Sequence, residues 1–298
     1  MAVAPPPVLT SKSGRSQFFR RLVRSRIALV AAFVFMVVAL SAVFAPLIAP
    51  NDPASLALIR RLKEPGYVDA NGKQYWLGTD TIGRDVYSRL VYGARISLIV
   101  GLSAVLLSGT VGVVLGLLSG FYGGLVDDII MRIADVQLSF PTILLALAIM
   151  AVLGPGLDKI ILVLGLTGWV QYGRIVRGQV LAIKEEEFVT AAHAIGQRDW
   201  RIIFQHILPN IWSPVIVIAS FSVASNIVSE ASLSFLGVGV PPQIPSWGVM
   251  LAEGRQFIGV AEWLTIPPGV AISLTVLSIN ILGDWLRDFL DPRLKNIM

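Results

Sequence analysis

The sequence predicts an all-α integral membrane protein with six transmembrane helices. Of its 298 residues, 55% are hydrophobic and only 14% are charged, whereas a soluble protein of this length carries about 25% charged residues. It also contains uncharged apolar runs of more than about 18 residues, the length that an α-helix needs to cross a bilayer. These runs are too evenly apolar for barrel strands, which alternate at every second residue.

Five long apolar runs and one shorter run define the six predicted helices. The long runs are residues 27–51, 96–120, 136–157, 207–229 and 263–283. The shorter run, residues 160–173, lies between Lys159 and Arg174. Their long side chains can reach the two membrane interfaces, so we predict that this run also spans the membrane.

The N-terminal segment, residues 1–26, is basic and is expected to lie in the cytoplasm. It carries Lys12 and five arginines before the first apolar run. That run is longer than the roughly 7–15 apolar residues of a signal peptide, so we expect a retained first helix with its basic flank inside. Six crossings then place the C-terminal tail, residues 291–298, in the cytoplasm as well. Residues 1–14 include three consecutive prolines and are expected to be disordered.

The predicted permease domain covers residues 27–290 and has three long connecting segments. These are an extracytoplasmic loop at 51–95, a cytoplasmic loop at 174–206 and an outer loop at 236–262. Within the second run, Gly112, Gly116 and Gly120 form two small-xxx-small repeats, which let helix backbones approach closely in lipid. This feature is compatible with a helix lining a transport pathway and equally with ordinary helix packing.

Residues 185–210 form a polar segment with helical periodicity between the fourth and fifth runs. Four residues fall on one helix face: Phe188, Ala191, Ala192 and Ile195. Gly196 is then expected to end this helix, and Asp199 to cap a second short helix. In the second helix one face would hold Trp200, Ile203, Phe204 and Ile207. Such faces suit either a membrane surface or a groove on a soluble partner, and the periodicity alone leaves both open.

The same segment resembles the coupling loop of ABC-importer permease subunits. The matching residues run from Ala191 to Gly196 and are followed by Leu208 and Pro209. In that family, the loop docks into a cleft of a cytoplasmic ATPase subunit. The resemblance therefore implies a docking surface made of Glu187, Phe188, Thr190, Ala191, Ala192, Ile195 and Gly196. Thr190 stands where the family pattern usually has Glu, and Glu187 supplies acidic character three residues earlier.

Three further stretches are similar to the oligopeptide, dipeptide and nickel permeases. They are WLGTDTIGRDVYSRLVYGARISLIVG (76–101), FLGVGVPPQIPSWGVML (235–251) and GDWLRDFLDPRL (283–294). Together with APLIAPNDP (45–53), they match the C-type subunit, and the resemblance covers most of the chain. It implies the type I ABC importer permease architecture in the bacterial inner membrane.

The resemblance also implies a set of partners and a class of solute. The partners would be a B-type permease subunit, one or two cytoplasmic ABC ATPase subunits and an extracytoplasmic solute-binding protein, besides membrane lipid. Peptides are the expected solute. Nickel, glutathione or another small solute is the alternative within the same machinery.

No motif for catalysis is found, so the chain is not expected to be an enzyme. It has no phosphate-binding loop, no H-E-x-x-H and no G-x-S-x-G. ATP and Mg²⁺ would be used by the partner subunits, while this chain binds no cofactor or metal. Its net charge of +5 is better explained by helix orientation than by nucleic-acid binding. An ATP-independent channel or secondary transporter is the alternative class, and it would need no docking loop.

A few polar residues are candidates for recognition outside the cytoplasm or within the path. Arg84, Asp85 and Trp247 lie in the outer segments and are candidates for docking the solute-binding protein, or else ordinary surface residues. Asn226 and Glu230 lie near the outer end of the fifth helix and are candidate pathway residues. The alternative for Glu230 is an interfacial carboxylate paired with a partner subunit.

Overall fold

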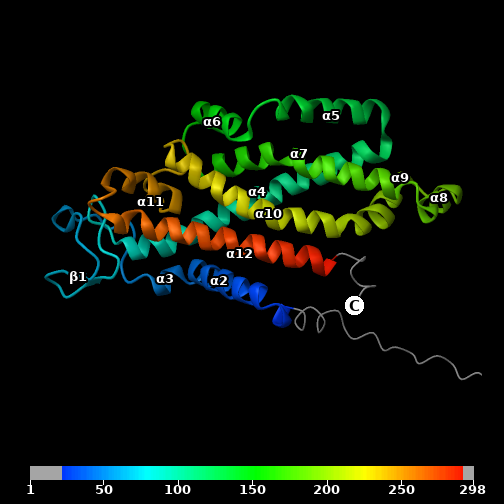
Figure 1. The fold of residues 1–298 in the computed structure, drawn as a ribbon. Helices are drawn as coiled ribbons and strands as arrows, with labels where there is room; N and C mark the ends of the chain where they lie inside the picture. The colour runs from blue at the N-terminus through cyan, green and yellow to red at the C-terminus, as the bar shows by residue number, and fades with distance from the viewer. Residues whose placement is uncertain (1–21, 291–298) are drawn as a thin grey trace, which may run out of the picture.

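Residues 22–290 are described by the computed structural model, in which long helices lie side by side (Figure 1). Within that range, four stretches are long and apolar enough to cross a membrane: Arg26–Val43, Val86–Tyr122, Asp199–Phe235 and Glu262–Leu290. The expected disorder of residues 1–14, most of the basic flank and the tail 291–298 lie outside the described residues.

The first apolar run forms two helices rather than one. Helix α2 (Arg26–Val43) begins after Ser25, whose side chain accepts a hydrogen bond from the Ala28 backbone N–H. The short helix α3 (Ala45–Ile48) follows and has Pro46 in its first turn. Proline has no N–H to donate and disfavours the helical conformation in the residue before it. The predicted helix over 27–51 therefore ends at Val43.

The outer segment between α3 and the next long helix has its own small structure. It contains the 3₁₀ helix η1 (Leu58–Arg60) and an antiparallel hairpin of β1 (Tyr67–Val68) and β2 (Gln74–Tyr75). In the hairpin turn, Asp69 accepts a hydrogen bond from the Lys73 N–H and pairs with Arg60 at 2.8 Å. These contacts hold the pKa of the Asp69 carboxyl below its usual value, and the hydrogen bond from the Lys73 N–H has the largest effect.

Helix α4 (Val86–Tyr122) is much longer than the predicted run 96–120. It starts at Val86 because Asp85 caps it, accepting a hydrogen bond from the Ser88 N–H at 3.2 Å. Residues 86–95, predicted as part of the outer loop 51–95, therefore belong to α4. The glycine repeats of α4 face helix α7 (Leu157–Ile183). A Cβ at Gly116 would lie 2.6 Å from the Gly173 carbonyl oxygen, which confirms the close helix packing predicted from the spacing.

The predicted helix over 136–157 is interrupted in the structure. Helix α5 (Gly124–Leu138) and helix α6 (Thr142–Leu153) are separate and meet at 86°. They make a fifth membrane crossing only if the bent pair counts as one span. The break falls just before α6, at Pro141, which disfavours a helical conformation at Phe140.

Polar contacts tie α5 to the neighbouring α7. Asp127 pairs with Arg177 at 2.6 Å, and Asp135 pairs with Arg174. The Trp169 indole N–H donates to the Gln137 side-chain oxygen at 2.9 Å. The charges of Arg174 and Arg177 on α7 are therefore neutralised by α5. Helix α7 itself is longer than the predicted run 160–173.

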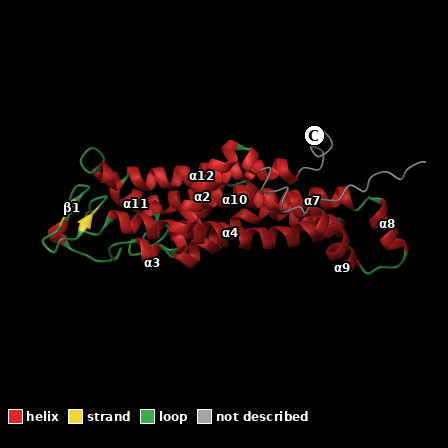
Figure 2. Cartoon of the chain, turned by 90° about the horizontal axis from the view of Figure 1, so that it is seen from below, coloured by secondary structure: helices red, strands yellow, loops and turns green. Residues whose placement is uncertain are grey.

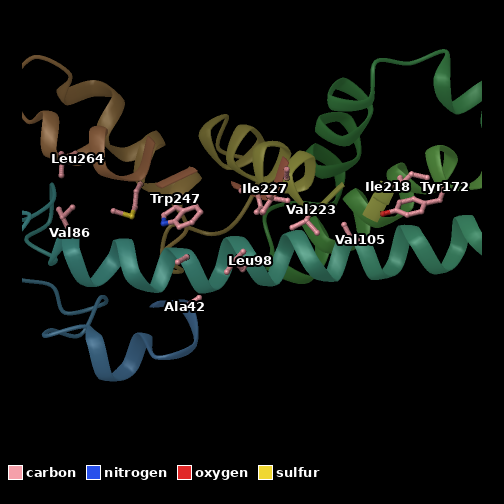
Figure 3. Close-up of a cluster of buried hydrophobic side chains, with 14 of the residues drawn as sticks. Ala42, Val86, Leu98, Val105, Tyr172, Ile218, Val223, Ile227, Trp247 and Leu264 are labelled. Carbon is pink, nitrogen blue, oxygen red and sulfur yellow. The ribbon is translucent and has the colours of Figure 1, made fainter. Parts of the chain in front are cut away.

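The second half of the chain completes the bundle. A helical stretch runs from α9 (Asp199–Arg201) through the π-helix η2 (Ile202–Ile207) into α10 (Leu208–Phe235). It is followed by α11 (Trp247–Gly254), the 3₁₀ turns η3 (Arg255–Phe257) and η4 (Glu262–Leu264), and α12 (Ile266–Leu290). The largest buried apolar cluster lies along α4, where side chains of α10 and α11 converge (Figure 3). Helix α2 begins and α12 ends at the end of the bundle that carries α8 (Glu187–Ala194), and the β-hairpin lies at the opposite end (Figure 1).

Candidate functional site

The polar segment singled out in the sequence projects from one end of the bundle (Figure 2). Helix α8 (Glu187–Ala194) ends as predicted: Gly196 adopts a φ of 76°, a left-handed conformation that favours glycine. The predicted cap of the next helix is displaced by one residue. Arg198 occupies the N-cap position without a side-chain hydrogen bond, and Asp199 is the first helical residue.

Helix α8 has a buried face and an exposed face, and the predicted docking residues divide between them. Val189 and Ala192 are buried against the protein's own helices, with Ala192 only 5% exposed. Phe188 is 44% exposed and Ile195 is 82% exposed. Ala192 therefore packs within this chain, and its part in the docking surface stays a prediction. The remaining predicted residues, Glu187, Phe188, Thr190, Ala191, Ile195 and Gly196, all lie on the exposed side.

The predicted apolar face of the following helix is also divided. Ile203 and Ile207 are buried together with Ile202, whereas Trp200 and Phe204 are exposed. The cause is the π-helical geometry of η2, in which residues five apart share a face. The predicted second short helix is not a separate element. Helix α9 and η2 continue through Pro209 into α10 without a break.

The buried side chains of α8 and η2 join these elements to the bundle. Val189, Ala192 and the isoleucines of η2 belong to one apolar cluster that also contains Leu117 of α4 and Val180 of α7. The His193 ring stacks on Phe121, at the end of α4, with a centroid separation of 5.9 Å. A displacement of α8 would therefore disturb its packing against α4, α7 and α10 at the same time.

A second candidate region is a cavity of about 530 Å³ bordered by α6, α7 and α10. Polar side chains of α10 line it at helical spacing: Ser222, Ser225, Asn226 and Ser229. We call these four residues the α10 polar stripe. Thr142, Gln171 and Arg174 contribute further polar groups from α6 and α7. Asn226, predicted as a pathway residue, thus faces a cavity of the size that ligand sites have.

Glu230 does not share this cavity, although it lies only one turn beyond Asn226. It is fully buried, and its carboxylate accepts hydrogen bonds from Ser97 at 3.1 Å, Ser234 at 2.8 Å and Ser246 at 2.9 Å. These serines come from α4, α10 and the N-cap of α11. The Glu230 carboxylate is therefore hydrogen-bonded within this chain. Its roles as a pathway residue or as the partner of another subunit stay predictions.

The three outer residues predicted to dock the solute-binding protein are buried. Arg84 forms ion pairs with Asp80 and with Glu253, the latter at 2.8 Å. Asp85 is the N-cap residue of α4. Trp247 is 2% exposed, and its indole N–H donates to the Leu90 carbonyl at 3.0 Å. Arg84 and Trp247 join α11 to the start of α4, and Asp85 caps α4, so contacts within this chain occupy all three side chains. Their role in docking the solute-binding protein stays a prediction.

Four charged residues form a network at the same end, in which three side chains are buried and that of Glu253 is 23% exposed. Asp80 and Glu253 each bind both Arg84 and Arg89. Arg89 is 2% exposed, and its Nε and Nη2 atoms have no hydrogen-bond partner among the described residues. We call these residues the outer charge network.

Most of the α10 polar stripe, Gln197 and Glu253 were not predicted from the sequence. Only the stripe had a pattern in the sequence that could have revealed it. The α10 polar stripe has the i, i+3, i+4, i+7 spacing and was detectable as a polar face on an apolar helix. Gln197, whose side chain contacts His206, and Glu253 had no local signal. Among residues 22–290, no group of three or more His, Cys, Asp or Glu is placed to hold a metal ion.

Comparison with known proteins gives consistent matches over nearly the whole chain. Residues 112–296 match the family described as binding-protein-dependent transport system inner membrane component. Residues 15–65 match the N-terminal TM domain of oligopeptide transport permease C. The chain is 42% identical to the dipeptide transport system permease protein DppC of Alkalihalophilus pseudofirmus, over 98% of this chain and 95% of the relative.

Two further relatives carry different names. The chain is 41% identical to the glutathione transport system permease protein GsiD of Pectobacterium atrosepticum, over 99% of this chain and 97% of the relative. It is 39% identical to the oligopeptide transport system permease protein OppC of Bacillus subtilis, over 91% of this chain and 87% of the relative.

Proposed function

Because this chain belongs to the family of binding-protein-dependent transport system inner membrane components, we propose that it forms the path for di- or oligopeptides in an ATP-driven importer. It is a multi-pass protein of the inner membrane and a C-type permease. The single observation that carries the proposed solute is its relationship, over nearly the full length, to dipeptide and oligopeptide permeases. A B-type permease subunit would complete the path.

The proposed topology has six crossings with both chain ends in the cytoplasm. It adds α7 and the bent α5–α6 pair to the four long apolar helices. Residues 160–173 of α7 carry no charge and lie between Lys159 and Arg174, which supports α7 as a span because the two long side chains can reach the membrane interfaces. The end that carries α8 is then cytoplasmic, with segments 1–26, 174–206 and 291–298, and residues 51–85 and 236–262 lie outside.

We propose that the exposed side of α8 docks one or two ABC ATPase subunits, which bind ATP and Mg²⁺. The proposed docking residues are Glu187, Phe188, Thr190, Ala191, Ile195 and Gly196. Exposed apolar side chains at the tip of a helix are suited to fill a groove on a partner, and Ile195 is the most exposed of them. The ATPase subunits, rather than this chain, would hydrolyse ATP.

Replacing Ile195 with aspartate is expected to weaken ATPase binding by about 30-fold or more. Desolvating a charge in place of an apolar anchor costs at least the ~2 kcal/mol of an interface hot spot. Because Ile195 is exposed, the fold should be kept. Co-purification of the ATPase subunits with the tagged chain measures the effect, with Val68→Asp in the outer hairpin as the matched control. ATPase recovery equal to the control would exclude Ile195 from the docking surface.

We propose that the solute passes along the α10 polar stripe. Hydroxyl and amide groups donate and accept hydrogen bonds, as the N–H and C=O groups of a peptide require. Asn226 is the largest side chain of the stripe and the one with the most hydrogen-bonding groups. Within the cavity lining, the charged residue Arg174 lies toward the cytoplasmic end and is paired with Asp135.

Replacing Asn226 with leucine is expected to lower peptide uptake by about tenfold. Losing one hydrogen bond to a polar solute, and leaving that solute group unpaired, costs roughly 1–2 kcal/mol. Uptake of labelled dipeptide into proteoliposomes carrying the complete transporter measures this, with Ser273→Leu on the exposed face of α12 as the control. Unchanged uptake with Asn226→Leu would place the path elsewhere.

Glutathione is the second candidate solute, because one relative is named for it. Uptake of a dipeptide, an oligopeptide, glutathione and Ni²⁺ by the same proteoliposomes, each with the cognate binding protein, would separate the candidates. ATP-dependent uptake of a dipeptide or oligopeptide supports the proposal. Uptake restricted to glutathione or Ni²⁺ would change the solute but keep the machinery, whereas uptake that ignores ATP would overturn the importer proposal itself.

A further inference from the structure

The turn after α8 is tied to the π-helix η2 by side-chain hydrogen bonds. The Gln197 side-chain oxygen lies 2.9 Å from His206 Nε2, and the Gln197 amide donates to Gln205 at 3.3 Å. The backbone of Gln197 is itself fixed, because its N–H donates to the Ala192 carbonyl at 3.1 Å across Gly196. This arrangement is the Schellman type of helix ending, and it directs the Gln197 side chain towards η2.

The π-helix explains why His206 is in reach. In an α-helix, residues four apart share a face, so His206 would lie above the buried Ile202. In η2 the wider turn brings Ile207 into that place, and both isoleucines are fully buried. His206 is thereby moved to the edge of the buried face, where its ring meets Gln197.

Two ring contacts also reach α8: the His193 ring stacks on Phe121 at 5.9 Å, and the Phe188 ring lies 6.4 Å from the His206 ring. The remaining contacts of α8 are of a different kind. Val189 and Ala192 pack in an apolar cluster, and such packing is not directional. It resists separation of the helices but does little to fix the angle between them. A hydrogen bond requires both a distance and a direction, so the contact between Gln197 and His206 restricts rolling of α8 on the cluster.

We propose that Gln197 and His206 are positioning residues, which hold α8 at a fixed angle to the helix leading into α10. A push on α8 from the ATPase subunits is then passed to α10 instead of being absorbed at the Gly196 turn. This inference rests on the proposed function as an ATP-driven importer. Neither residue touches the solute or the nucleotide; both act through α8.

The test measures how many ATP molecules are hydrolysed for each peptide imported. In proteoliposomes with the complete transporter, Gln197→Ala and His206→Ala should keep ATP hydrolysis within about twofold. Peptide uptake should fall by about fivefold, as for loss of an ordinary hydrogen bond, so the ratio rises. His206→Gln places an amide donor near the lost Nε2 and should restore the ratio. Gln205→Ala removes only the longer contact and should change it little.

A covalent link gives an independent measurement. Because the chain contains no cysteine, Gln197→Cys with His206→Cys can be joined specifically by a short bis(methanethiosulfonate) reagent. Joining should restore the wild-type ratio, and reduction should raise it again. An unchanged ratio in both alanine variants would overturn the inference. So would His206→Gln behaving like His206→Ala. Wild-type uptake that ignores ATP would instead overturn the proposed function, so the two failures are distinguishable.

Discussion

Replacing Arg89 with alanine is expected to lower the unfolding temperature by roughly 10 °C or more. Removing one partner of a buried ion pair costs about 3–5 kcal/mol, because the opposite charge is left buried and unpaired, and a protein of this size loses about 2–4 °C per kcal/mol. Arg89 is buried against both Asp80 and Glu253, so its loss leaves two carboxylates to share Arg84.

Thermal unfolding of the purified protein in detergent measures this effect. Arg95→Ala is the matched control, because Arg95 lies on the same helix but is exposed. Its unfolding temperature should stay within about 2 °C of wild type, as for ordinary surface substitutions.

A double variant tests the cause of the loss. Adding Glu253→Gln to Arg89→Ala removes one of the stranded charges and should recover part of the stability, as expected for coupled residues. Equal stability of Arg89→Ala and Arg95→Ala would show that the outer charge network does not stabilise the fold.

Replacing Gly116 with leucine is expected to prevent α4 and α7 from packing. A Cβ at this position would lie 2.6 Å from the Gly173 carbonyl oxygen and 2.8 Å from Val176 Cβ. The first obstacle is backbone and cannot rotate away, so the cost should exceed the ~1–3 kcal/mol typical of overpacking. We expect little folded protein in the membrane, measured as the monodisperse fraction on size-exclusion chromatography after extraction.

The chain supplies a matched control for this change. Gly178→Leu introduces the same side chain on α7, where a Cβ would meet no atom within 4 Å. Its yield should equal or exceed that of wild type, since leucine favours a helix by up to about 1 kcal/mol over glycine. Gly116→Ala should fall between the two. A normal yield for Gly116→Leu would mean that α4 and α7 are less closely packed than the structure shows.

The sequence predicted the helical membrane class and the position of each apolar segment, because these depend on local composition. It also predicted the helix at 187–194 and its end at Gly196, since periodicity and a glycine with positive φ act over a few residues. The glycine repeats of α4 predicted a close helix contact for the same reason. The family resemblance agreed with the later comparisons, because its motifs lie along most of the chain.

Errors in the predicted helices arose where the backbone departs from a regular α-helix. The run 136–157 was predicted as one helix, but Pro141 divides α5 from α6 and the two helices meet at 86°. The π-helix η2 buries Ile202 and Ile207, which lie five residues apart, on one face, and no count based on 3.6 residues per turn predicts this. Such departures depend on packing against the rest of the protein.

What the sequence determined by itself was the kind of protein and the helical segment at 185–210 that we propose for ATPase docking. Only the tertiary structure decided which polar side chains are available to a partner or solute. Arg84, Asp85, Trp247 and Glu230 are as polar or aromatic as any surface residue, but partners distant in the chain bury them. Glu253 lies 164 positions from Arg89, and Ser97 lies 133 positions from Glu230. Burial of a charge depends on such distant partners, and hydropathy read along the chain contains no information about them.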